Sequence, residues 1–526
     1  MSKIVEVNVQ SEIGKLNGVI LHTPGEEVEN MTPENAERAL YSDILNLSIA
    51  RKEYKQLSEV LGKITKTYQV KDLLTNILKD DAIKLEVLNR IEKIEPFIAE
   101  VTPKGSIKDQ LLDEDAENLA RLLIEGVEMK RDTLTKFLNK DWYDLRPLHN
   151  FFFTRDASMS MYNEVLIGRM ANAVRDREAI IMQSIFDFTP GFNTKTLSLN
   201  TESDPLRKLT IEGGDVQIAR DDILVIGNGM RTSTRAIDAL MYNFINRNED
   251  KVQHILVQEL PHSPESFIHL DMVFTFLDKD KCMVYEPLIM SPGNYQTVHI
   301  KIQHGKLISI RREKTLLHAL KKLGMDLEPV YCGGEDETWN MEREQWHSGA
   351  NFFCVAPGKV LGYARNNYTV EAMNNAGFEI IKANDILNGG INLDGEVVVD
   401  PGVGVGDEVN AGDDPAGDRK AAAPDRIADG ADFVFQFRQF LAEFQIGEFR
   451  KGCKVFFSDF QQREIGVVGD VFDPGWNFPG GTVLGNIDTF GVTDNVRIGE
   501  EGPFADEEGR TDASAVVSWL PRHGIV

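Results

Sequence analysis

LTIEGGDVQI, residues 209–218, places Glu212 and Asp215 on either side of a Gly-Gly step and continues with alternating apolar and polar residues. Such alternation predicts a β-strand with one buried face. The glycines are typical of a surface turn, but they also allow the backbone to approach another group closely, with the two carboxylates facing it. Both interpretations fit these ten residues, so the surrounding chain has to decide between them.

The composition predicts a soluble protein with more than one part, because 526 residues exceed one ordinary core. A formal net charge of −26 argues against nucleic acid and anionic membranes as partners, since both require a basic surface. The first residues contain no signal peptide, and no stretch is long and apolar enough for a membrane span. The four cysteines include no C-x-x-C pair, which predicts a reducing, cytoplasmic location.

Residues 1–390 are predicted to form a mixed α/β domain. Strands rich in Val, Ile, Leu and Phe are expected at 18–24, 163–168, 222–229, 254–260 and 271–278. Helices are expected at 175–188 and 235–247. Between about 71 and 140, apolar residues recur at helical spacing with almost no strand signal, which predicts a helical insert.

The composition changes after about residue 390. Residues 391–526 contain 20 of the 43 glycines, and their 25 acidic residues outnumber 11 basic ones, giving about −14 of the total charge. Few bulky apolar residues are available there to offset the entropy of ordering the chain. We therefore expect a Gly/Asp-rich C-terminal extension of uncertain fold, separate from the first domain.

Two further stretches contain residues suited to chemistry. HNFFFTRDAS (149–158) places Asn150, Arg155 and Asp156 beside three phenylalanines that include Phe153, and an apolar neighbourhood strengthens charge interactions. A structural ion pair between Arg155 and Asp156 is the alternative there. In HLDMVFTF (269–276), His269 and Asp271 would share one face of a strand.

Arg231 completes the candidate residues, in a loop before the second predicted helix, where it can receive an anion. An ordinary solvated arginine is the alternative. Three carboxylates (Asp156, Glu212, Asp271) and one histidine favour a planar cation such as guanidinium, which binds carboxylates bidentately. A metal site is disfavoured, because these residues include one histidine and no matching second one.

Several of these motifs together resemble the arginine deiminases, in that family's order. The resemblance extends from about residue 11 to 388 and includes SEIGKLNGVILHTPGEEVENMTPEN (11–35), FTRDAS (153–158), EGGDV (212–216), HLDMVFT (269–275) and REQWHSGANFFCVAPGKVLGYARNNYT (343–369). It implies a five-bladed α/β propeller, the pentein fold, with a helical insert. It also implies conversion of L-arginine and water to L-citrulline and ammonia, with no cofactor and no metal.

The resemblance also implies residue roles. Asp156 and Asp271 would hold the guanidinium, His269 would act as general acid and base, and Glu212 would lie beside the reacting carbon. The substrate-binding residues would be Asn150, Phe153, Arg175, Asp215 and Arg231, with Arg177 left open as the alternative to Arg175. The state of assembly, including a homo-oligomer, is left open.

The nucleophile remains unassigned. The family's cysteine attacks the guanidinium carbon from a glycine-rich loop near its C-terminus, and no segment here matches that loop. Cys282 and Cys354 are predicted to be buried core residues, and Cys332, before a Gly-Gly step, to be partly exposed. Beyond the matched region only Cys453 remains, and the Lys-Val-Phe-Phe that follows it suits a buried strand. The alternatives are a non-catalytic arginine-binding protein and another guanidine hydrolase or amidinotransferase.

Overall fold

The computed structural model describes residues 5–31, 44–99, 105–199, 208–335, 337–388 and 398–400. The chain divides into two units, Met1–Gly404 and Val405–Val526, and the account below concerns the first. Apart from 398–400, the extension expected from residue 391, with Cys453, lies outside the described residues. The expected division into a domain of residues 1–390 and an extension therefore stays a prediction.

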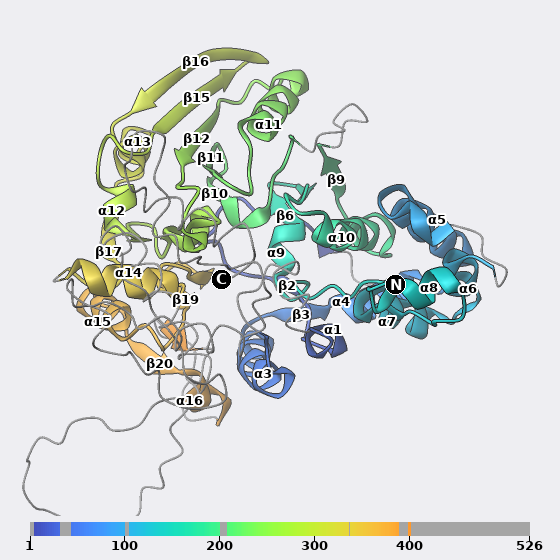
Figure 1. The fold of residues 1–526 in the computed structure, drawn as a ribbon. Coiled ribbons are helices and arrows are strands. Elements are labelled where there is room, and N and C mark those ends of the chain that lie inside the picture. The colour runs from blue at the N-terminus through green and yellow to red at the C-terminus, as the bar shows by residue number, and fades with distance from the viewer. Residues whose placement is uncertain are drawn as a thin grey trace, which may run out of the picture. The chain divides into compact units, whose positions relative to one another are not determined.

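The first unit has an α/β fold whose sheets lie around a common centre (Figure 1). In strand order, the five main sheets of the described part are β2 (Gly18–Leu21) with β3 (Lys66–Gln69); β6 (Ser158–Met161), β7 (Glu164–Ile167) and β9 (Lys195–Ser198); β10 (Val216–Arg220), β11 (Ile223–Asn228), β12 (Gln253–Glu259), β15 (Thr297–Gln303) and β16 (Lys306–Glu313); β13 (Phe274–Phe276), β14 (Lys281–Val284) and β17 (Glu328–Tyr331); and β18 (Phe353–Ala356), β19 (Lys359–Leu361), β21 (Val398–Asp400) and β20 (Ile380–Lys382). Two small pairs join β1 (Val5–Glu6) to β8 (Phe192–Asn193) and β4 (Val127–Glu128) to β5 (Tyr143–Leu145).

One local order recurs in three of these sheets. An antiparallel hairpin, such as β10–β11, is followed by a strand parallel to its second member, here β12. The same holds for β6–β7 with β9 and for β13–β14 with β17. Parallel neighbours need a crossover, which α10 (Asp176–Phe188), α11 (Thr234–Arg247) and α13 (Leu316–Lys322) supply. The apolar run of β11 is buried on both faces, as a central strand requires.

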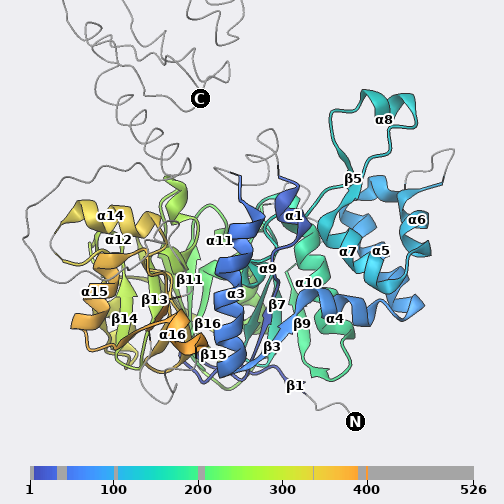
Figure 2. The same cartoon turned by 90° about the horizontal axis from the view of Figure 1, so that it is seen from below.

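Helices occupy most of the stretch where a helical insert was expected, and Figure 2 shows them beside α10, with α8 projecting outward. These are α4 (Val70–Ile77), α5 (Asp81–Ile94), η1 (Pro96–Ala99), α6 (Ile107–Asp113), α7 (Ala116–Glu125) and α8 (Leu134–Leu138). Their starts are capped: Asp80 and Asp115 accept hydrogen bonds from first-turn amides, and Ser106 forms a capping box with Asp109. Their buried leucines and isoleucines form one core with α10.

The other helices pack around the sheets or carry turns near the centre. They are α1 (Glu26–Glu29), α3 (Leu47–Ile64), α9 (Thr154–Ala157), η2 (Ala173–Arg175), η3 (Gly213–Asp215), η4 (Glu265–Phe267), η5 (Leu270–Met272), α12 (Glu286–Ile289), α14 (Thr338–Trp346), α15 (Asn367–Asn375) and α16 (Ala383–Leu387). Among the described residues, no helix combines the length and apolar character needed to cross a membrane.

Two of the expected strands begin later than predicted. In 209–218 the Gly-Gly step and Asp215 form the 3₁₀ turn η3, and β10 starts only at Val216. In 269–276, His269 and Asp271 lie in the tight turn around η5 rather than on one face of a strand, and β13 starts at Phe274. The strand geometry predicted for His269 and Asp271 is therefore wrong. Both turns lie before strands, at the centre of the fold.

Candidate active site

Three short turns meet at the centre of the fold and carry the predicted site residues. Turn η3 packs against both α9 and η5. A Cβ atom on Gly213 would lie 1.9 Å from the Arg155 carbonyl oxygen, and one on Gly214 would lie 2.5 Å from Nδ1 of His269. Only glycine permits these approaches, because real Cβ contacts are longer. The Gly-Gly step thus brings Glu212 against α9 and η5.

A buried cluster of one imidazole and two carboxylates results. His269 Nε2 lies 3.1 Å from Glu212 Oε2, and His269 Nδ1 lies 3.8 Å from Asp156 Oδ1. The second oxygen of Glu212 accepts a 2.8 Å hydrogen bond from the Ala171 amide, which fixes the carboxylate. All three charged side chains are buried. The cluster brings together, from distant parts of the chain, three of the four predicted catalytic residues.

The electrostatics of the cluster favour a protonated histidine. Burial alone would lower the pKa of His269, but the Asp156 charge, the hydrogen bond with Glu212 and the charge of Asp215 raise it to about 10. Burial works against ionised Glu212, yet its hydrogen bond and charge interaction with His269 keep its pKa below the ordinary value. An imidazolium between carboxylates can donate a proton to a leaving group.

Asp271, the fourth predicted catalytic residue, is electrostatically linked to the same cluster. Burial raises its pKa to about 6, with His269 opposing this shift and Asp156 adding to it. Its carboxylate also accepts a hydrogen bond from Asn351. Two carboxylates around one imidazole leave the site rich in acceptors, which suits a ligand that only donates hydrogen bonds.

Arg175 belongs to the cluster, and Arg177 does not. Arg175 Nη1 lies 2.8 Å from Asp156 Oδ2 and 3.9 Å from Glu212 Oε2, while its Nη2 donates to Glu178 at 2.9 Å. Arg177 points elsewhere and pairs with Glu95 at 2.9 Å. Of the two arginines that the spacing left open, the structure therefore places Arg175 at the site.

Arg231 and the remaining predicted ligand residues lie around the cluster at different depths. Arg231 Nη1 lies 3.7 Å from Glu212 Oε1, and its side chain is 13% exposed. Asn150 is buried, and its carbonyl accepts a 3.3 Å hydrogen bond from Arg175. Phe153 is 47% exposed, with its ring 4.3 Å from that of Phe152. A partly open cation and an exposed aromatic ring are thus available to substrate atoms beyond the guanidinium.

Asp215 lies beneath the cluster. It is fully buried, and its Oδ1 accepts a 2.9 Å hydrogen bond from the Leu270 amide, between His269 and Asp271. Burial raises its pKa to about 7, opposed by the charge of His269. A Cβ on Gly227 would lie 2.2 Å from Oδ1, so the carboxylate is closely packed. This geometry favours a role in holding the η5 turn over direct contact with a ligand.

The structural pair between Arg155 and Asp156 does not form. Arg155 pairs with Glu12 through two hydrogen bonds of 3.1 and 2.8 Å, and Asp156 pairs with Arg175 instead. Glu178 is a buried member of the charge cluster that the sequence analysis missed; burial raises its pKa to about 7, opposed by Arg175. Its spacing of three residues from Arg175 on a helix was the available signal.

The cysteines of the described residues lie away from this cluster. Cys282, Cys332 and Cys354 are all buried, and burial raises the pKa of the Cys332 and Cys354 thiols to about 12. The prediction that Cys332 is partly exposed is wrong, because Gly349 and Thr369 pack against its sulfur. A thiol with so high a pKa is a poor nucleophile at neutral pH.

Asp156, Glu212 and His269 also offer one ligand atom each within 4.8 Å of one another, a spacing that could hold a metal ion. Two arginines, Arg175 and Arg231, lie within 4 Å of these carboxylates and already supply positive charge. Added cationic charge would be repelled there. These neighbours favour an organic cation that donates hydrogen bonds in one plane.

The fold and the site define the class: an α/β protein with a buried carboxylate and imidazole pocket of the kind that guanidine chemistry requires. The family model described as "Arginine deiminase" matches residues 37–387. The chain belongs to the arginine deiminase family. Arginine deiminases of Bacillus cereus strain ATCC 10987 are 32% identical over 388 residues, covering 72% of this chain and 93% of the relative. For Clostridium perfringens strain SM101 the identity is 30%, covering 71% and 92%.

Solved structures with some likeness to the chain act on related compounds by their descriptions. An amidinotransferase from Microseira wollei is 13% identical, covers 71% of this chain and 90% of its own, and has a TM-score of 0.40. A dimethylarginine dimethylaminohydrolase from Pseudomonas aeruginosa, complexed with citrulline, is 12% identical, covers 70% and 91%, and has a TM-score of 0.36. The family assignment depends on the sequence matches alone.

The raised pKa of His269 predicts a pH-dependent stability. Its pKa is about 10 in the folded chain, against 6.5 as the ordinary value, so the charged cluster stabilises the fold fully below about pH 6.5. That contribution is lost as the pH rises through about 10. We expect the difference in free energy of unfolding between the wild type and His269→Gln to shrink between pH 7 and 10 in urea titrations. A His304→Gln control, at an exposed site, should show no such trend.

Proposed function

We propose that the buried cluster binds the guanidinium of L-arginine and that its chemistry is that of an arginine deiminase. The reaction is L-arginine with water to L-citrulline and ammonia, through a cysteine-linked amidino intermediate. The observation that carries the proposal is the geometry of Asp156, Glu212 and His269 around one point, with Asp271 coupled to them. Family membership names arginine as the substrate class.

The roles follow from the contacts. Asp156 and Asp271 would each accept two guanidinium N–H bonds, because planar guanidinium pairs with carboxylates in that way. Protonated His269, 3.1 Å from Glu212, would deliver a proton to the departing nitrogen and then accept one from water. Arg231 would receive the substrate carboxylate, with Asn150 and Phe153 beside the aliphatic part and the amino group. Arg175 would keep Asp156 and Glu212 ionised.

We further propose that the five main sheets are the blades of a five-bladed α/β propeller. Each is placed around the centre that holds the cluster (Figure 1). The recurring order of hairpin, helix and parallel strand supports this interpretation. A propeller would explain why all the predicted catalytic residues lie on turns at the ends of strands. A cytoplasmic location and a homo-oligomer remain proposals of the same standing.

The nucleophile is tested by activity. The described residues place no reactive thiol at the cluster, since Cys282, Cys332 and Cys354 are buried with raised pKa values. We therefore expect the purified full chain to bind L-arginine in calorimetry and to form no citrulline above background in a colorimetric assay. Citrulline that disappears in Cys453→Ser would identify Cys453 as the nucleophile. Citrulline that persists in that variant would mean that another group attacks.

These two measurements also separate the alternatives. Arginine binding without turnover describes a non-catalytic arginine-binding protein, which the buried cysteines favour. Binding of agmatine as tight as that of arginine would favour a different guanidine hydrolase, because agmatine lacks the carboxylate that Arg231 would receive. Absence of binding by either compound would overturn the proposed function.

A further inference from the structure

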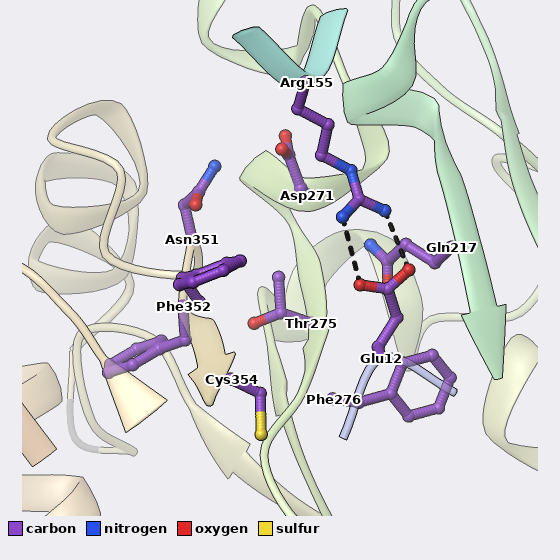
Figure 3. A pocket seen from close by; sticks show the side chains of 10 residues that line it. Glu12, Arg155, Gln217, Asp271, Thr275, Phe276, Asn351, Phe352 and Cys354 are labelled. Carbon is purple, nitrogen blue, oxygen red and sulfur yellow. Dashed lines mark hydrogen bonds and ion pairs between the residues drawn. The ribbon is translucent and has the colours of Figure 1, made fainter. Parts of the chain in front are cut away.

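A separate chamber lies next to the proposed guanidinium site and shares Asp271 with it (Figure 3). Its volume is about 70 Å³, several times the space that one water molecule needs. The residues that define this Asp271 chamber are Glu12, Arg155, Gln217, Asp271, Thr275 and Phe352. None of the roles proposed above uses the chamber.

The hydrogen-bond donors that line the chamber are engaged by the protein itself. Arg155 gives Nη1 and Nη2 to the two oxygens of Glu12, Nε to the Gly213 carbonyl at 3.0 Å and Nη2 to the Val216 carbonyl at 2.6 Å. The hydroxyl of Thr275 donates to the Ala350 carbonyl at 2.7 Å. The arginine charge is thereby neutralised by Glu12 at close range.

The acceptors are not all engaged. Gln217 is 3% exposed; its Nε2 donates to the Phe274 carbonyl at 2.8 Å, while its Oε1 is buried and has no partner among the described residues. A buried acceptor without a donor costs roughly 1–3 kcal/mol. Asp271 adds a second acceptor, and the Phe352 ring supplies a face that attracts cations. With Glu12 and Arg155 cancelling, Asp271 leaves the chamber with a net negative charge.

A ligand for this chamber should therefore be small, cationic and rich in donors. Ammonium has four N–H donors, no acceptor and a single positive charge. The proposed reaction releases one ammonia per arginine, which becomes ammonium when it takes up a proton from His269 or water. We propose that the Asp271 chamber is a monovalent-cation site that receives the ammonium leaving the guanidinium site. The identity of the cation as product depends on the proposed function; the cation site does not.

The test measures the unfolding midpoint of the full chain in ammonium chloride and in tetramethylammonium chloride at equal ionic strength. Ammonium should raise the midpoint by about 1 °C or more beyond the larger cation, because a ligand bound only by the folded state stabilises it. The excess should vanish in Gln217→Leu and persist in Gln258→Leu, a buried glutamine on β12 outside the chamber. Potassium chloride serves as a third salt, since potassium has the charge but no N–H donors.

A second variant guards against a folding defect in Gln217→Leu. Gln217→Glu keeps the shape and adds a negative charge, so it should enlarge the ammonium shift. An ammonium excess that is absent in the wild type, or equal in the wild type and Gln217→Leu, would overturn the site. A potassium shift as large as that of ammonium would show a general monovalent site and overturn selectivity for the product. If the wild type responds to ammonium but binds no arginine, the proposed function falls and the cation site stands.

Discussion

Asp156→Asn is expected to weaken L-arginine binding by about 30-fold or more, equivalent to roughly 2 kcal/mol. The asparagine keeps the shape of the carboxylate but presents an N–H group to a guanidinium that can only donate. It also removes the charge that Asp156 places 2.8 Å from Arg175 and 3.8 Å from His269. Isothermal calorimetry with L-arginine measures the change directly, and Asp271→Asn should show a loss of similar size.

Asp187→Asn is the matched control for this prediction. Asp187 also pairs with an arginine, Arg90, at 2.7 Å, but its side chain is 22% exposed on α10 and lies outside the cluster. Its replacement should leave arginine affinity within about twofold. Unchanged binding in both Asp156→Asn and Asp271→Asn would remove the guanidinium pocket from this account.

Arg175→Met is expected to destabilise the fold by about 3–5 kcal/mol, the usual penalty for removing one partner of a buried ion pair. Arg175 is the nearest cation to three buried carboxylates, those of Asp156, Glu178 and Glu212. Without it, all three have to stay charged without that compensation or take up protons. Urea-induced unfolding at pH 7.5 measures the loss.

The control and the pH dependence sharpen this second prediction. Arg121→Met removes a half-exposed arginine from an i,i+4 pair with Glu125 and should cost less than about 1 kcal/mol. The Arg175→Met penalty should shrink toward pH 5, because the uncompensated carboxylates then bind protons in the folded state. Equal losses for the two arginine variants would contradict a special role for Arg175.

Much of the chemistry could be predicted from short motifs. Glu212, His269, Asp271 and Asp156 were singled out from their neighbours in the sequence, and three of them meet in one cluster. The helices at 175–188 and 235–247 were predicted within one residue of α10 and α11. Periodicity suffices for such elements because the spacing of apolar residues along the chain decides which face can be buried.

Partner choice could not be predicted in this way. Arg155 stands next to Asp156 in the sequence but pairs with Glu12, 143 residues away. Arg175 and Arg177 have nearly the same local sequence, yet only the first reaches the cluster. A long side chain pairs with whatever charge the folded backbone brings within reach, and that proximity is not encoded in nearest neighbours.

The sequence by itself determined the family, the secondary structure of the longer elements and the set of charged residues around the site. The tertiary structure alone decided that the Gly-Gly step is a close contact between three turns, that Cys332 is buried, and that Gln217 faces a chamber beside Asp271. The reason is physical: local patterns record which residues can form a helix or a strand. Burial, ion pairing and pKa depend instead on segments that are far apart in the chain and adjacent only when it folds.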